Sequence, residues 1–241
     1  MEKLQKKLND LIESLSKEKR DQIRARLEDL FSVYPFNEYE YIISVLLGMD
    51  KISIDDYYEI RDEYMARNMY LYIFEIGAPR GFGETWAQGH LKELIPDLVK
   101  PTKKLDKDYS GQYDFLLAHE KKNIRIEVKA SRAVDGDDRG PLYVKALASD
   151  SKKNFWMNFQ QAKPTCCDAF VLVAVWRDLI KYWVLSSKEF EQNDYYSKGQ
   201  HRGNVGEGQL HIKQDNIREF DKYLCRSDKL RDCVINAIGR K

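Results

Sequence analysis

Hydrophobic residues recur at helical spacing through the first third of the chain. Over residues 4–31 the leucines and isoleucines follow each other at intervals of about three, four and seven residues. A short apolar helix is expected over residues 39–49. Ser53, followed closely by two aspartates, is a suitable N-cap for a further helix that continues to about Phe74. The sequence therefore predicts an N-terminal helical lobe over residues 1–76.

A different pattern follows the loop around Gly81. Apolar and polar residues first share one helical face up to Pro96, with Glu84 and Gln88 on that face. Alternating or fully apolar runs then predict strands, so residues 77–241 are expected to form an α/β core. The strands are expected at residues 112–118, 123–131, 141–147, 169–175 and 182–185, and a helix at 153–163 that ends before Pro164.

The candidate chemistry lies on the first two of these strands. Apolar residues alternate with charged ones from Ile124 to Lys129, which places Glu127 and Lys129 on one face of the second strand. Asp114 lies on the neighbouring strand and can reach that face. Two carboxylates at close range repel each other unless a cation lies between them, and carboxylates favour a hard ion such as Mg²⁺. This combination is suited to a metal-dependent phosphodiesterase.

Asp114 followed by Glu127-Val128-Lys129 resembles the PD-(D/E)xK nuclease superfamily, over roughly residues 83–186. The resemblance implies a restriction-endonuclease-like core, in which helices flank a mixed central sheet in the order αβββαβ. It also implies an Mg²⁺ cofactor bound by Asp114, Glu127 and the Val128 carbonyl, with Lys129 orienting the attacking water. Glu84 would assist the metal or its water. A solvated, charged strand face is the alternative interpretation of the motif.

Residues that could contact DNA lie in two loops and at the end of the predicted helix. The loops span residues 132–140 and 197–211, and both are rich in polar and turn-forming residues. Side chains such as Arg, Gln, His and Asn can contact phosphates or base edges. Solvated surface loops and a polar helix end are the alternatives. The candidate DNA-binding residues are Arg132, Arg139, Gln161, Lys163, His201, Arg202, Asn204 and Gln209.

Composition narrows the class of protein only modestly. The 241-residue chain is 43% hydrophobic and 33% charged with a net charge of +1, so no global basic charge argues for nucleic acid. Four cysteines without a Cys-x-x-Cys spacing favour free thiols and a cytoplasmic location over a zinc site or a disulfide framework. No apolar run reaches the length of a membrane span, and the N-terminus does not have the pattern of a signal peptide.

The sequence thus leads to the hypothesis of an Mg²⁺-dependent, sequence-specific double-stranded DNA endonuclease of the type II restriction class. A homodimer is expected because cutting both strands of a palindrome needs two sites. A cognate DNA methyltransferase would be a functional partner. The alternatives are a nuclease of repair or junction processing on the same core, and a non-catalytic DNA-binding protein.

Overall fold

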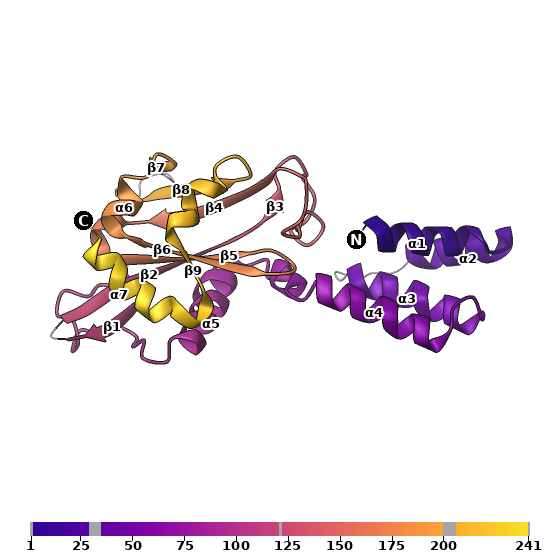
Figure 1. The fold of residues 1–241 in the computed structure, drawn as a ribbon, viewed down its shortest axis with the longest axis horizontal. Coiled ribbons are helices and arrows are strands. Elements are labelled where there is room, and N and C mark those ends of the chain that lie inside the picture. The colour runs from indigo at the N-terminus through magenta and orange to yellow at the C-terminus, as the bar shows by residue number, and fades with distance from the viewer. Residues whose placement is uncertain (1, 29–34, 121, 200–205, 241) are drawn as a thin grey trace.

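The computed structural model describes residues 2–28, 35–120, 122–199 and 206–240, which form a helical lobe and a larger α/β core (Figure 1). The lobe lies at one end of the molecule, and the C-terminus lies on the side of the core away from it (Figure 1). Four α-helices make up the lobe: α1 (Glu2–Glu13), α2 (Lys17–Glu28), α3 (Pro35–Gly48) and α4 (Ile54–Arg67).

The helical lobe has a hydrophobic core of its own. Ile60 and Tyr64 on α4 are buried against leucines and isoleucines of the other helices. Ser53 caps α4 in a capping box with Asp56. The expected continuation of this helix to Phe74 is wrong, because α4 ends at Arg67 and the chain continues in a separate 3₁₀-helix, η1 (Leu71–Glu75).

A five-stranded mixed sheet forms the centre of the core, in the order β1-β2-β5-β6-β9. β2 and β5 are parallel, and the other neighbours are antiparallel. The fully buried β5 matches its predicted bounds. The strands are β1 (Phe115–His119), β2 (Lys122–Arg132), β5 (Ala169–Val175), β6 (Ile180–Ser186) and β9 (Leu224–Cys225).

A second, antiparallel sheet contains the main departure from the predicted fold. The helix expected over residues 153–163 is a strand, β4 (Phe155–Ala162), and residues 141–147 contribute only an isolated bridge from Ala146 to Val134. The predicted element order is therefore wrong between the second strand and β5. The second sheet has the order β3-β4-β8-β7, with β3 (Val134–Asp135), β7 (Tyr196–Lys198) and β8 (Gly208–Lys213).

The two faces of the central sheet pack against different layers. One face, with Ile126 and Val171, packs on the helices α5 (Gln88–Leu94) and α7 (Leu230–Gly239). The other face packs on the inner side of the second sheet, where Phe159 and Leu210 are buried. The remaining short helices are η2 (Gly81–Ala87, π-helical), η3 (Pro164–Cys166), α6 (Ser187–Glu191), η4 (Ile217–Tyr223) and η5 (Ser227–Lys229).

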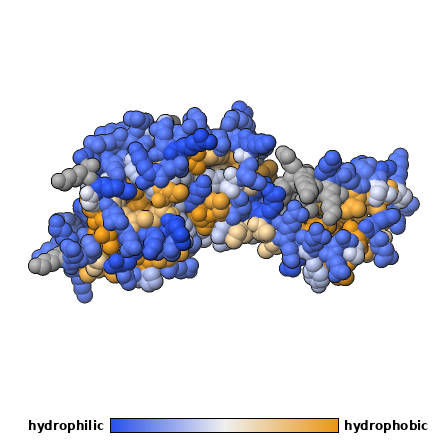
Figure 2. Space-filling view, viewed as in Figure 1, coloured by the Kyte–Doolittle hydropathy of each residue, from blue (hydrophilic) through white to orange (hydrophobic). Residues whose placement is uncertain are grey.

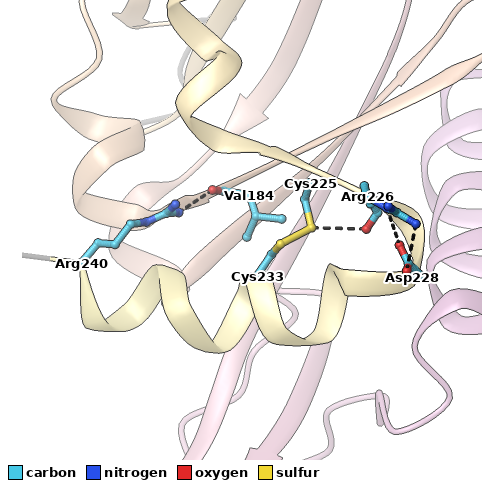
Figure 3. The surroundings of a disulfide bond; sticks show 6 residues. All are labelled: Val184, Cys225, Arg226, Asp228, Cys233 and Arg240. Carbon is cyan, nitrogen blue, oxygen red and sulfur yellow. Dashed lines mark hydrogen bonds and ion pairs between the residues drawn. A yellow bond between two sulfur atoms is a disulfide. The ribbon is translucent and has the colours of Figure 1, made fainter.

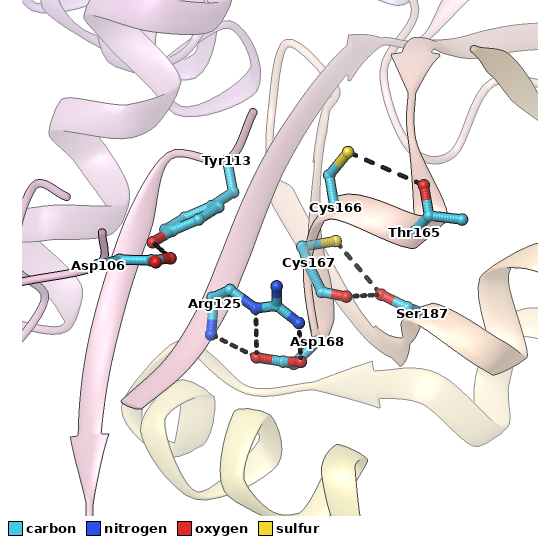
Figure 4. Close-up of polar contacts among 8 residues, drawn as sticks. All are labelled: Asp106, Tyr113, Arg125, Thr165, Cys166, Cys167, Asp168 and Ser187. Carbon is cyan, nitrogen blue, oxygen red and sulfur yellow. Dashed lines mark hydrogen bonds and ion pairs between the residues drawn. The ribbon is translucent and has the colours of Figure 1, made fainter. Parts of the chain in front are cut away.

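Polar contacts fix the strands that carry the candidate site. The guanidinium and backbone N–H of Arg125 on β2 both donate to the Asp168 carboxylate at the start of β5 (Figure 4). Tyr113, which precedes Asp114, donates its hydroxyl to Asp106 at 2.6 Å (Figure 4). These contacts hold the segment before β1 and the β2–β5 pair in register close to Asp114.

The C-terminal segment is fastened by a disulfide. Cys225 on β9 is bonded to Cys233 on α7, while Arg240 at the end of α7 donates to the Val184 carbonyl (Figure 3). The expectation that all four cysteines are free is therefore wrong for this pair, and Cys166 and Cys167 are free thiols.

The surface in view is mostly hydrophilic over both parts of the molecule, with hydrophobic residues showing between the polar ones (Figure 2). None of the helices in the described part of the chain has the length and apolar character needed to span a bilayer.

Candidate active site

Asp114 lies beside β2 just before β1 begins. Its backbone N–H donates to the Ile126 carbonyl at 3.0 Å, and its Oδ2 accepts from the Val128 N–H at 2.8 Å. The Asp114 carboxylate therefore accepts the Val128 N–H, which a backbone carbonyl would accept if β1 extended further towards the N-terminus. Because Ile126 and Val128 flank Glu127, these two bonds bring Asp114 against the Glu127 carboxyl group.

A polar chain from the first core helix orients Asp114. The Gln88 amide on α5 donates to Asp114 Oδ1 at 2.6 Å, and Lys100 donates to the other end of the same amide. Gln88 is buried, so its contact with Asp114 is shielded from water, whereas Lys100 is exposed. Both oxygens of Asp114 thus have a fixed donor, which holds the carboxylate in one orientation.

Glu127 and Lys129 form an ion pair on the same face of β2, as the alternation predicted. Their side chains are 13% and 16% exposed, and Lys129 Nζ is 2.6 Å from Glu127 Oε1. Burial is the main reason that the pKa of Glu127 is raised to about 7; Lys129 opposes the shift and Asp114 adds to it. Burial also raises the pKa of Asp114. Two acids and Lys129 therefore share a desolvated site, and Lys100 also stabilises the charged form of Asp114.

Three oxygen donors meet at this point of β2. Besides the two carboxyl groups, the Val128 carbonyl faces the β1 side, because the N–H and C=O of a strand residue point to the same edge and its N–H binds Asp114. No group of three His, Cys, Asp or Glu side chains that could hold a metal occurs among the described residues. The donor set is two carboxylates and one carbonyl, which are hard oxygen ligands of the kind that Mg²⁺ takes while retaining several waters.

The carboxyl pair opens into a cleft of about 620 Å³. One wall consists of β2 with the helix η2, and the opposite wall is the β4 strand of the second sheet. The Asn158 N–H of β4 donates to Ser131 Oγ of β2 at 2.9 Å, which joins the two walls at their base. The lining residues of the β4 wall are Trp156, Asn158, Gln160 and Gln161.

Arg132 occupies the end of β2 inside this cleft, not the loop surface that the sequence suggested. Its guanidinium lies 3.9 Å from the centroid of the Phe82 ring and donates to the Ile76 carbonyl at 2.8 Å. Its Nε is buried without a hydrogen-bond partner, and within the described ranges no carboxylate pairs with it. Burial lowers its pKa to about 10, so it remains a cation at neutral pH.

Glu84 and Arg139 are not brought to the carboxyl pair. Glu84 lines the mouth of the cleft from η2, but its side chain is 60% exposed and pairs with Arg80 at 3.2 Å. Arg139 is exposed in the loop after β3. Glu84 thus shares the cleft but pairs with Arg80, and Gln88 is the side chain of this helical region that bonds to Asp114.

The remaining candidates fall on the second sheet or outside the described part of the chain. Gln161 does not end a helix: it lies in β4, exposed at the cleft and with a positive φ of 56°. Lys163 pairs with Glu207 at 3.0 Å, and Gln209 on β8 accepts a hydrogen bond from Asn158 at 2.8 Å. The three candidates outside the described residues are His201, Arg202 and Asn204.

Several residues of the cleft were missed because β4 was taken for a helix. In a strand Trp156, Asn158 and Gln160 share one face, whereas helical spacing assigned Phe155, Phe159 and Ala162 to one apolar face. The strict alternation of Phe155, Met157 and Phe159 was the signal that could have revealed the strand. Gln88 was placed on the correct helical face but was not assigned a role.

The sequence matches no known family model, and no curated protein matches it. The geometry of the cleft is therefore the main basis for a functional proposal.

Proposed function

We propose that the protein is an Mg²⁺-dependent endonuclease that hydrolyses phosphodiester bonds of double-stranded DNA at specific sequences, as a type II restriction enzyme does. The observation that carries this proposal is the desolvated set of Asp114, Glu127 and Lys129 at the floor of an open cleft. A solvated charged strand face would leave these side chains exposed, and they are largely buried instead.

The residues present fit a divalent cation. Burial raises the pKa values of two adjacent carboxyl groups, and a cation bound between them would stabilise their charged forms. Asp114, Glu127 and the Val128 carbonyl would hold the ion. When bound, Mg²⁺ would supply Lewis-acid polarisation of the phosphate and a bound water of lowered pKa.

The protein's own groups would orient the reaction. Lys129 is fixed by Glu127, and its remaining N–H donors can hold the attacking water and stabilise negative charge on the phosphate oxygens. Gln88 and the Val128 N–H keep Asp114 in one orientation. Attack of the water oxygen on phosphorus would form one P–O bond and break the bond to the 3′-oxygen. The attacking water would release a proton to the solvent, and the departing 3′-oxygen would take one up from the solvent. The resemblance implies a 5′-phosphate and a 3′-hydroxyl as products.

Arg132 would bind a DNA phosphate near the reacting one. It is a buried cation with an unsatisfied Nε, and it lines the same cleft as the carboxyl pair. A planar guanidinium that has no carboxylate partner is suited to bind phosphate oxygens. This role differs from the loop contact suggested by the sequence, although the ligand is the same.

A second copy of the chain would cut the other DNA strand, and a methyltransferase would protect the host sequence. The helical lobe offers an exposed stripe for the dimer contact: Ile54, Tyr58 and Met65 share one side of α4 and are 51%, 52% and 49% exposed. Sedimentation analysis should show a dimer, and the double substitution Tyr58→Ser with Met65→Ser should shift it to monomers that nick one strand.

The test is to incubate unmethylated plasmid and phage DNA with the protein, with and without Mg²⁺. Glu127→Ala is compared with Glu59→Ala, which removes an exposed glutamate of α4 and should leave activity unchanged. Discrete fragments that require both Mg²⁺ and Glu127 support the proposal. A smear of fragments would support nuclease activity but contradict the proposed sequence specificity.

The absence of cleavage on every duplex would contradict the proposal as a whole. Binding of DNA without hydrolysis would then favour the non-catalytic alternative. Cleavage restricted to branched DNA would favour junction processing.

A further inference from the structure

The outer face of the β4–β8 pair is a polar ribbon beside the carboxyl site. Trp156 lies opposite Lys213 and Asn158 opposite His211, and all four side chains are on the face away from the hydrophobic core. Their inward neighbours, such as Met157 and Ile212, are completely buried. The ribbon is therefore held rigidly from behind while its polar face is open to the cleft.

A β-bulge gathers three glutamines on this ribbon. Phe159 pairs with Leu210 and Ala162 with Gly208, so Gln160 and Gln161 together oppose Gln209. Gln161 has the positive φ expected of a locally distorted strand, and both β4 glutamines are exposed at the cleft. A regular strand would turn one of them into the core, and the bulge instead presents both.

The amide cluster, defined here as Asn158, Gln160, Gln161 and Gln209, carries donors and acceptors but no charge. Asn158 donates to Gln209 at 2.8 Å, and its own Oδ1 is buried without a hydrogen-bond partner. An unsatisfied buried acceptor favours a ligand that brings a donor. Neutral amides lack the positive charge that strengthens contacts to phosphate oxygens, and they match the paired donors and acceptors of base edges.

We infer that the amide cluster reads base edges in the major groove of duplex DNA next to the phosphodiester at Asp114 and Glu127. This inference rests on the proposed function, and it names the surface that confers its specificity. The major groove admits a two-stranded antiparallel ribbon. Asn158, Gln160 and Gln161 line the same cleft as the carboxyl pair, and Gln209 is bonded to Asn158. Lys213 at the far end of the ribbon adds a positive charge that suits the flanking phosphates.

The experiment uses a pool of duplexes with a randomised segment, cut in the presence of Mg²⁺ and sequenced at the new ends. The wild-type protein is compared with the double variant Gln160→Ala, Gln209→Ala, and with Gln192→Ala as a matched control in the exposed turn after α6. The wild type and the control should prefer the same sequence. The double variant should still cut but lose about tenfold or more of its preference at one or more base pairs.

A second measurement is needed in case the double variant cuts too slowly for its sequence preference to be determined. The sequences that each protein retains in a binding selection are determined in a Glu127→Gln background, where cutting does not interfere. An unchanged preference in both measurements overturns the inference and leaves the nuclease proposal intact. A wild type that cuts without any preference also overturns it. A wild type that neither binds nor cuts DNA overturns both.

Discussion

The two walls of the cleft hold their polar side chains in different ways. On the β2 wall, Asp114, Glu127 and Lys129 are largely buried and bound to each other or to Gln88 by short contacts. On the β4 wall, the amides are half-buried or exposed, and a single bond joins Asn158 to its neighbour across the ribbon. Fixed, desolvated charges favour chemistry, whereas groups that can exchange water for a base favour recognition. The comparison predicts that rate and specificity respond to substitutions on different walls.

The largest effect is expected for Lys129→Met. The substitution keeps the bulk of the side chain and removes the cation, so we expect the cleavage rate to fall by about 10³-fold, which corresponds to about 4 kcal/mol of transition-state stabilisation. The base preference of the residual activity should not change. Single-turnover kinetics and end sequencing measure the two quantities. Lys152→Met, at an exposed lysine before β4, is the control.

A smaller effect is expected for Gln88→Ala. Losing a group that orients a metal ligand costs about 10–100-fold in affinity or activity, so the variant should need more Mg²⁺ and cut more slowly. Gln192→Ala provides the matched control, because that glutamine is exposed outside the cleft. A rate and Mg²⁺ dependence equal to those of the wild type would show that Asp114 is oriented without the amide.

Two strands with the same alternation show what the sequence could predict. In β2, three apolar residues alternate with charged ones, which no helix would place on one face, and the strand and its Glu127–Lys129 face were predicted correctly. In β4, Phe155, Phe159 and Ala162 also satisfy helical spacing, and the intervening Trp156 is apolar enough to fit either pattern. Helix and strand periods coincide at four residues, so the spacing of Phe155 and Phe159 could not decide between them.

The positions of the candidate side chains could be predicted from the sequence except where local backbone geometry decides them. Glu84 and Gln88 lie about one turn apart, but residues 81–87 are π-helical rather than α-helical, and Arg80 lies four residues before Glu84, where it pairs with its carboxylate. Gln88 reaches Asp114, and Glu84 faces the solvent. The bulge at Gln161 and the Cys225–Cys233 disulfide depend on long-range pairing, which spacing along the chain does not reveal.

The rigidity of the β4–β8 ribbon can be tested at Gly208. A Cβ there would lie 2.4 Å from Tyr196 ring atoms and 2.5 Å from the Ser197 carbonyl of the paired strand β7. We expect Gly208→Ala to lower the free energy of unfolding by roughly 1–3 kcal/mol in urea titrations. Gly89→Ala on α5, where nothing lies within 4 Å of the added atom, is the control. Equal stability of the two variants would show that the β7–β8 contact is not tight.

The smallest expected effect is a change in melting temperature, which tests the charge on the β2 wall independently of DNA cleavage. The pKa of Glu127 is raised to about 7 from its ordinary 4.5, so the stability that its protonated form provides is present below pH 4.5 and lost as the pH rises through 7. At pH 8 without Mg²⁺, Glu127→Gln removes a desolvated negative charge, while Asp114 remains to interact with Lys129. The variant should therefore melt a few degrees higher than the wild type at pH 8, and about equally at pH 5, although it cannot cut DNA.

Mg²⁺ should reverse the order of the melting temperatures of the wild type and Glu127→Gln at pH 8. An ion that binds only the folded protein raises the melting temperature of the wild type, and the variant, with one carboxylate fewer, should respond weakly. Differential scanning calorimetry of the wild type and Glu127→Gln, each with and without Mg²⁺, gives the four melting temperatures. Glu59→Ala is again the control. A wild type that melts higher than Glu127→Gln in the absence of Mg²⁺ would mean that the carboxyl pair is already balanced by the protein. The β2 wall would then be a structural ion network rather than a cation site.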